Sequence, residues 1–176
     1  MKCWGLNDHG QLGDGTTTTR SAPTLITGLH NVATLALGES HTCAVLTDGT
    51  TFCWGLNSSG QLGDGTTTER TSPVNASWYS NFASLSAGTA NTCGRLTDGK
   101  IRCWGYNSNL ELGVGDTAAT SSPASSAVLS VTSASQIASG LSYGCAVITG
   151  GTVQCWGADV LGVPTIGLRS TSGFIP

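Results

Sequence analysis

Charged residues are scarce in this chain of 176 residues, where Asp, Glu, Lys and Arg together make up 10% of the sequence. Surface helices usually carry many such residues, so their scarcity disfavours a helical bundle. Only 7 residues are Lys or Arg and the net charge is −3, which leaves no electrostatic basis for binding the backbone of a nucleic acid. We therefore expect neither a helical bundle nor a nucleic-acid-binding protein.

Long apolar runs are missing too, and none approaches the roughly 20 residues that a membrane-spanning helix requires. We therefore expect no membrane span. Hydrophobic residues still reach 39% of the chain, enough to bury a core and to exclude a disordered tail. Small residues that are poor helix formers are abundant, with 25 Gly, 25 Thr and 21 Ser.

What the sequence does contain is a tandem repeat. Cys-Trp-Gly occurs four times, beginning at Cys3, Cys53, Cys103 and Cys155. Three blocks of 21 residues align without a gap, at positions 35–55, 85–105 and 137–157. A second shared block, LNDHGQLGDGTTTTRSAP in its first copy, follows each Cys-Trp-Gly and fades towards the C-terminus. We interpret residues 1–176 as a single array, with approximate units 3–52, 53–102, 103–154 and a partial unit 155–176.

Each 21-residue block contains the signal of a β-hairpin. A Thr-Asp-Gly or Thr-Gly-Gly turn lies between runs of strand-forming residues. If Gly49 takes the left-handed position of a three-residue loop, the register places Cys43 opposite Cys53. That position is a non-hydrogen-bonded pair, whose short separation suits a cross-strand disulfide. The same count predicts three disulfides: Cys43–Cys53, Cys93–Cys103 and Cys145–Cys155.

Two or more short strands in each unit of ~50 residues, without helical periodicity, are typical of a propeller blade. The pattern CWGxNxxGQLGDGTTT…HTCAVLTDGT…CWG covers nearly the whole chain and resembles the regulator of chromosome condensation repeat, in its cysteine-bearing form from bacterial extracellular proteins. The resemblance implies an all-β fold, a β-propeller of four-stranded blades, usually seven to a ring, that acts as a binding platform. Seven units would need about 350 residues, so about three and a half repeats predict an incomplete seven-bladed propeller.

The first residues align with the second strand of a hairpin, because Met1–Gly5 match residues 51–55. Cys3 is then the odd one of seven cysteines, and its partner would lie ten residues upstream. We expect Cys3 to be unpaired and the chain to be a piece of a longer repeat protein. The alternative is a complete short protein with one spare thiol. In either case the array can self-associate through open blade edges or a Cys3–Cys3 bridge.

The aromatic residues fall into two groups. One tryptophan follows the cysteine of each Cys-Trp-Gly, and we expect these four to pack between neighbouring blades: Trp4, Trp54, Trp104 and Trp156. Trp78 and Tyr79 instead replace Gly28 and Leu29 of the preceding unit, in a segment that should be a loop. Because loops on a rigid scaffold often carry binding function, Trp78 and Tyr79 are a candidate binding loop. Local filling of the core is the alternative.

No set of residues indicates catalysis or a bound metal. Zinc sites favour cysteines two to four residues apart, whereas nine residues separate the paired cysteines here. Asp14-Gly15 and Asp64-Gly65 lie in Gly-rich loops, but one carboxylate per loop is too few for calcium, so turn formation explains them better. Ser40-His41 is not accompanied by a nucleophile–base–orienter set. We expect no enzyme activity, no metal and no cofactor.

Disulfides imply an oxidising compartment. We therefore expect a non-catalytic binding scaffold of a secreted or cell-surface protein, bacterial by resemblance, that binds an unknown protein or surface ligand. One alternative is an intracellular regulator, such as a guanine-nucleotide exchange factor for a small GTPase. Another is a set of accessory repeats beside a catalytic domain outside this chain.

Overall fold

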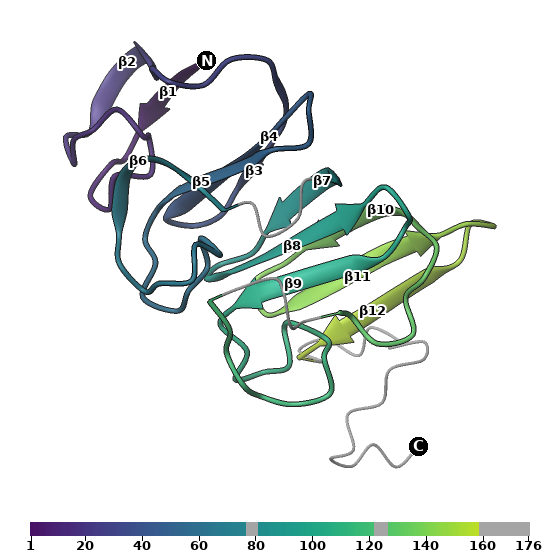
Figure 1. Ribbon diagram of the computed structural model, residues 1–176. Helices are drawn as coiled ribbons and strands as arrows, with labels where there is room; N and C mark the ends of the chain where they lie inside the picture. The colour runs from purple at the N-terminus through teal and green to yellow at the C-terminus, as the bar shows by residue number, and fades with distance from the viewer. Residues whose placement is uncertain (77–80, 122–126, 159–176) are drawn as a thin grey trace.

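The computed structural model describes residues 1–76, 81–121 and 127–158, and within these ranges the chain forms twelve β-strands and no helix (Figure 1). The strands form four antiparallel sheets. The first sheet holds β1 (Lys2–Gly5) and β2 (Arg20–Leu25), and the second holds β3 (Val32–Leu37), β4 (His41–Leu46), β5 (Thr51–Gly55) and β6 (Arg70–Asn75). The third holds β7 (Phe82–Ala87), β8 (Asn91–Leu96) and β9 (Ile101–Gly105), and the fourth holds β10 (Ala134–Ser139), β11 (Tyr143–Ile148) and β12 (Val153–Gly157).

The hairpin between β4 and β5 forms in the register that its turn predicts. Gly49 has a φ of +84°, in the left-handed region that glycine adopts without strain. The turn closes on Leu46, whose backbone N–H donates to the carbonyl of Thr50 at 2.8 Å. Counting outward from there, Cys43 lies opposite Cys53. The local chemistry of the turn therefore sets the pairing of the two strands.

The sheets and the sequence repeats are out of phase. The second sheet begins at Val32, whereas the Cys-Trp-Gly motif falls in its third strand, β5. A sequence repeat that begins at Cys-Trp-Gly thus supplies the last two strands of one sheet and the first two strands of the next sheet. In the third sheet, two isolated bridges take the place of a fourth strand, from Arg102 to Ala127 and from Gly105 to Thr120.

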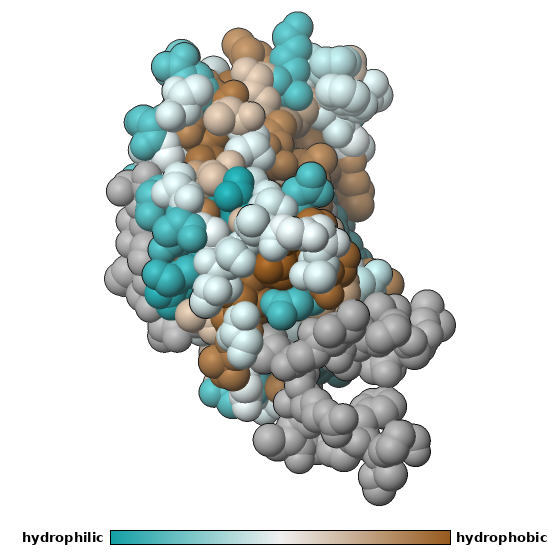
Figure 2. Space-filling model, turned by 90° about the vertical axis from the view of Figure 1, so that its right-hand side faces the viewer, coloured by the Kyte–Doolittle hydropathy of each residue, from teal (hydrophilic) through white to brown (hydrophobic). Residues whose placement is uncertain are grey.

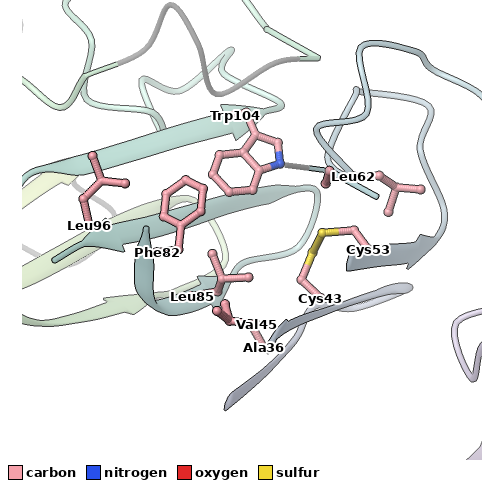
Figure 3. Close-up of a cluster of buried hydrophobic side chains, with 10 residues drawn as sticks. Ala36, Cys43, Val45, Cys53, Leu62, Phe82, Leu85, Leu96 and Trp104 are labelled. Carbon is pink, nitrogen blue, oxygen red and sulfur yellow. A yellow bond between two sulfur atoms is a disulfide. The ribbon is translucent and has the colours of Figure 1, made fainter. Parts of the chain in front are cut away.

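Successive sheets pack face to face along the chain, with the first strands of the later three sheets near one another (Figure 1). The largest core cluster lies between the second and third sheets, where Val45 and Leu85 meet beside the Cys43–Cys53 disulfide (Figure 3). Phe82 and Trp104 extend this cluster, with ring centroids 5.7 Å apart. A second cluster fills the space between the third and fourth sheets. The fold is all-β, and its sheets are arranged as propeller blades.

Candidate functional site

Three disulfides fasten the central hairpin of each later sheet. They join Cys43 to Cys53, Cys93 to Cys103 and Cys145 to Cys155, the three pairs that the sequence predicts. The Cα atoms of the pairs are 4.0 to 4.1 Å apart, close to the shorter of the two spacings of an antiparallel ladder. Cys3 is free and half-buried, and burial raises the pKa of its thiol.

The Gly-rich block after each Cys-Trp-Gly folds around one buried asparagine. The side-chain oxygen of Asn7 accepts from the backbone N–H of Leu12 at 2.9 Å, and its amide donates to the carbonyls of Thr16 and Thr18. Asn57 and Asn107 repeat this arrangement in the next two blocks. Each block is therefore a compact loop that one buried side-chain amide holds together, by pairing with three backbone groups of its own block.

Asp14 closes its loop with a dense set of hydrogen bonds. Its carboxylate accepts from the hydroxyl of Thr16 at 2.7 Å and from Nε of Arg20 at 2.7 Å. Burial would raise the pKa of Asp14, but these hydrogen bonds outweigh it and lower the pKa to about 2. Asp64 makes the same contacts in the next copy. These carboxylates stabilise turns, and the described residues contain no group of three or more His, Cys, Asp or Glu positioned to hold a metal ion.

A tryptophan joins each later sheet to the loop before it. Trp54 donates its indole N–H to the backbone carbonyl of Gln11 at 2.9 Å, and the hydroxyl of Thr42 donates to the same oxygen. Trp104 and Trp156 make the equivalent bonds to the carbonyls of Gln61 and Glu111. These three tryptophans are buried between successive sheets, as predicted. Trp4 differs, because 61% of its surface is exposed.

A buried histidine lies in the joint between the second and third sheets. His41 is 1% exposed, and its Nε2 lies 2.9 Å from the hydroxyl oxygen of Thr92. Its Nδ1 is buried and has no hydrogen-bond partner among the residues that the structure describes. Burial lowers the pKa of His41 to about 4, so the imidazole is neutral at physiological pH.

Three equivalent loops meet at one end of the sheets and form a shallow hollow of about 380 Å³. They are residues 37–39, 87–89 and 139–141, and each begins with the last residue of its strand, which is β3, β7 or β10. The middle residue of each is glycine, and the loops pack backbone to backbone. A Cβ atom on Gly38 would lie 2.8 Å from the carbonyl oxygen of Gly88, and one on Gly88 would lie 2.6 Å from that of Gly140.

The side chains around this hollow are half apolar and half polar: Leu37, Ala87 and Leu141, and Glu39, Thr89 and Ser139. Leu37 and Leu141 are exposed, at 69% and 76%, and Glu39 is the charged residue of the lining. Exposed apolar surface also occurs elsewhere, since brown patches lie between hydrophilic ones on the face seen in Figure 2. The hollow differs from these other apolar patches because three sheets contribute equivalent residues to it.

The candidate binding loop, Trp78 and Tyr79, lies outside the described residues. The residues on either side of it are at the end of the sheets that carries the hairpin turns: Ala76 bonds to Thr51, and Asn81 to Thr97. The hollow is at the opposite end, and sequence reasoning missed it. The signal was present, since Gly38, Gly88 and Gly140 occupy one position of the aligned blocks.

Comparison with known proteins finds matches to a family model. The model of the Regulator of chromosome condensation (RCC1) repeat matches residues 3–45 and 48–94, and a second model of this repeat matches residues 32–61 and 82–110. The E3 ubiquitin-protein ligase HERC2 of Homo sapiens is 50% identical over 46 residues, which are 25% of this chain and 1% of HERC2. The HERC2 of Mus musculus matches to the same extent.

Solved structures share the fold. Prp20p from Saccharomyces cerevisiae superposes with a TM-score of 0.76 and 22% identity, over 89% of this chain and 40% of Prp20p. Human WBSCR16 superposes with a TM-score of 0.71 and 20% identity, over 86% of this chain and 40% of WBSCR16. This chain therefore spans about two fifths of these structures. No helix in its described residues is long and apolar enough to cross a membrane.

Proposed function

The chain belongs to the regulator of chromosome condensation repeat family, and we propose that it is a non-catalytic scaffold that binds a macromolecule at the hollow, outside the cell or on its surface. One observation carries this proposal: three equivalent loops from three successive sheets converge on one site, at residues 37–39, 87–89 and 139–141. Related propeller proteins support a role in protein interaction, and the site and the compartment are our inference.

The three loops combine a fixed frame with variable side chains. The glycine recurs in each loop and packs on the neighbouring loop, so the backbone positions are constrained by close contact. The residues before and after it differ at each copy: Leu37 and Glu39, Ala87 and Thr89, Ser139 and Leu141. A rigid backbone with freely varied side chains lowers the entropic cost of binding and lets specificity change.

The form of the hollow favours a macromolecular ligand. It is shallow and open, whereas sites for small molecules usually enclose most of the ligand. Its exposed leucines, Leu37 and Leu141, would cover an apolar side chain of a partner, and Glu39 at its rim would pair with a basic one. We therefore expect a protein surface that presents an apolar residue next to Lys or Arg.

The disulfides support an extracellular location, because such bonds persist in oxidising compartments. Thiol counting on protein isolated from its own cells, under non-reducing conditions, tests this location. The six cysteines of the three disulfides are expected to be unreactive. Seven free thiols would overturn the extracellular proposal and favour an intracellular regulator.

Site-specific photo-crosslinking tests the hollow as the binding site. A photoreactive amino acid replaces Leu37 or Leu141 in two separate proteins, and Asp48 in the exposed hairpin turn at the opposite end is the matched control position. Each protein is irradiated with surface proteins of its source cells. One shared partner, cross-linked from both leucine positions and not from Asp48, is expected. Cross-links from Asp48 alone, or from none of the three, would refute the site.

Leu37→Glu and Leu141→Glu then test the contribution of the leucines. Each variant is expected to weaken binding of that partner at least about tenfold, because a buried apolar contact of this size contributes about 1.5 kcal/mol or more. Asp48→Asn is expected to leave the affinity unchanged. Affinities of all three variants follow from titration calorimetry with the purified partner.

A further inference from the structure

A buried histidine lies directly against one loop of the hollow. A Cβ atom on Gly38 would collide with Nδ1 and Cε1 of the His41 ring and would lie 2.8 Å from the carbonyl oxygen of Gly88. The ring therefore lies at the point where loop 37–39 meets loop 87–89. The backbone N–H of Gly38 also donates to the carbonyl of His41 at 2.9 Å. A movement of the histidine would thus disturb the loop.

The hydrogen bonds of the ring fix its tautomer. The hydroxyl of Thr92 donates its single hydrogen to the carbonyl of Gln61 at 2.8 Å, so its oxygen can only accept from His41. The Nε2 atom of His41, 2.9 Å from that oxygen, therefore carries the hydrogen. This leaves a lone pair on Nδ1, which is buried and has no partner in the part of the chain that the structure describes. A further proton on Nδ1 would bring a positive charge into this enclosed contact.

The described residues around His41 provide no charge to compensate that proton. Gly55 of β5 lies opposite His41, and Gly88 and Thr92 approach it from the third sheet; none of them ionises. Glu39, two residues before it, is exposed at the rim of the hollow. Burial is accordingly the cause of the low pKa of His41, and no charged group contributes to it.

The next joint has the same backbone contacts around a side chain that does not titrate. Asn91 takes the place of His41, and the backbone N–H of Gly88 donates to its carbonyl at 2.9 Å. A Cβ atom on Gly88 would collide with the side-chain oxygen of Asn91 and would lie 2.6 Å from the carbonyl oxygen of Gly140. An asparagine therefore supports a loop of the hollow at this position, and the two joints differ in their capacity to bind a proton.

We propose that His41 is a proton-sensitive support of the hollow: the neutral ring holds loop 37–39 against loop 87–89, and its protonation moves the ring out of the joint and opens this contact. The direction follows from the two pKa values. A ring released into water binds a proton at its ordinary pKa of 6.5, whereas the enclosed ring binds one only near pH 4. The open arrangement therefore gains population as the pH falls from 6.5 towards 4, by at most about tenfold for each pH unit.

The opening stays local because the joint has a second connection. Trp104 donates its indole N–H to the carbonyl of Gln61 at 3.0 Å, the same oxygen that accepts from Thr92. Both of these bonds remain when the ring of His41 leaves. The second and third sheets thus stay joined while the ends of their loops separate.

A partner held at the hollow would be released in acid. This consequence rests on the function proposed for the hollow, whereas the opening itself does not and can be measured on the chain alone. Histidine suits such a role because its ordinary pKa lies close to physiological pH.

Amide hydrogen exchange, followed by NMR on the intact chain without a partner, tests the opening. The amides of Gly38 and Gly88 make equivalent hydrogen bonds, to the carbonyls of His41 and Asn91, so Gly88 is the matched control within the same molecule. Protection is compared at pH 7.5 and pH 5, after correction for the effect of pH on the intrinsic exchange rate. Protection of Gly38 is expected to fall about 25-fold and that of Gly88 less than about twofold.

The variant His41→Asn, which copies the next joint, separates the proton from the shape of the side chain. Its Gly38 amide is expected to have the same protection at both pH values, within about twofold. Two-bond ¹H–¹⁵N spectra of the unmodified chain should show the hydrogen of His41 on Nε2 at pH 7.5.

Three results would overturn the proposal: unchanged protection of Gly38 in the unmodified chain, an equal fall at Gly38 and Gly88, or the same fall at Gly38 in His41→Asn. The comparison of the two glycines in the unmodified chain decides the matter by itself if the variant does not fold. None of these measurements uses a partner, so their outcome is independent of whether cross-linking finds the hollow occupied.

Discussion

Replacing Trp104 by phenylalanine tests whether the tryptophan joint holds neighbouring sheets together. Trp104 is fully buried, donates to the carbonyl of Gln61 at 3.0 Å and packs against Phe82. The change removes one hydrogen bond, which contributes about 1 kcal/mol. The smaller ring also leaves a cavity in a packed core, which costs about 1–2 kcal/mol more. The free energy of unfolding should therefore fall by about 2–3 kcal/mol.

Trp4→Phe is the matched control, because it makes the same chemical change at an exposed position. It should alter the free energy of unfolding by less than about 0.5 kcal/mol. Urea titrations followed by far-ultraviolet circular dichroism give both values by linear extrapolation. If the two variants lose equal stability, the indole contact is not what joins the sheets, and the account given for all three joints is wrong.

Three further changes address other parts of the fold. Gly63→Ala places a Cβ atom 2.6 Å from the indole nitrogen of Trp104, whereas a Cβ atom on Gly28, which has a similar positive φ, meets open space. In urea titrations, Gly63→Ala should therefore lower the free energy of unfolding by about 1–3 kcal/mol more than Gly28→Ala does. The pKa of His41 is lowered from 6.5 to about 4, so the unfolded chain binds the proton more tightly, and about 3 kcal/mol of stability should be lost as the pH falls from about 6.5 to 4. His41→Asn should remove that dependence between pH 7 and pH 4.5, and an unchanged slope would contradict it. Replacing Cys93 and Cys103 together by serine should cost about 2–3 kcal/mol in thermal unfolding, since each bridge closes a short loop, and an unchanged midpoint would show that the bridge adds no stability.

The hairpins could be predicted from the sequence because their determinants are local. Gly49 requires a left-handed backbone, and that one residue fixes the closing pair and the partner of every residue along both strands. The disulfides follow from the same count. The family resemblance then supplies the number of strands in a blade, which local pattern alone does not give.

The hollow could not be predicted because it depends on how separate sheets stack. The shared glycine at 38, 88 and 140 is visible in the aligned blocks, but nothing local shows that Gly38 packs on Gly88, and Gly88 on Gly140, across a sheet boundary. The exposure of Trp4 has a similar origin. Trp4 occurs in the same Cys-Trp-Gly motif as the buried tryptophans, but burial of its side chain depends on what packs against it, which the motif does not specify.

The tryptophan of each later sheet bonds to a backbone oxygen, so the residue that supplies this oxygen can change its side chain without loss of the bond. In each block the side-chain oxygen at the position of Gln61 accepts a backbone N–H of its own loop, and the glutamate at 111 does the same. The carbonyl of that residue remains free to accept the tryptophan. The third block has Val114 where earlier blocks have aspartate, yet Trp156 is still buried. The polar part of the coupling between neighbours therefore depends on a main-chain oxygen and one indole, beside the apolar clusters that fill the joints. The loop side chains at the hollow belong to neither and can vary without weakening the coupling.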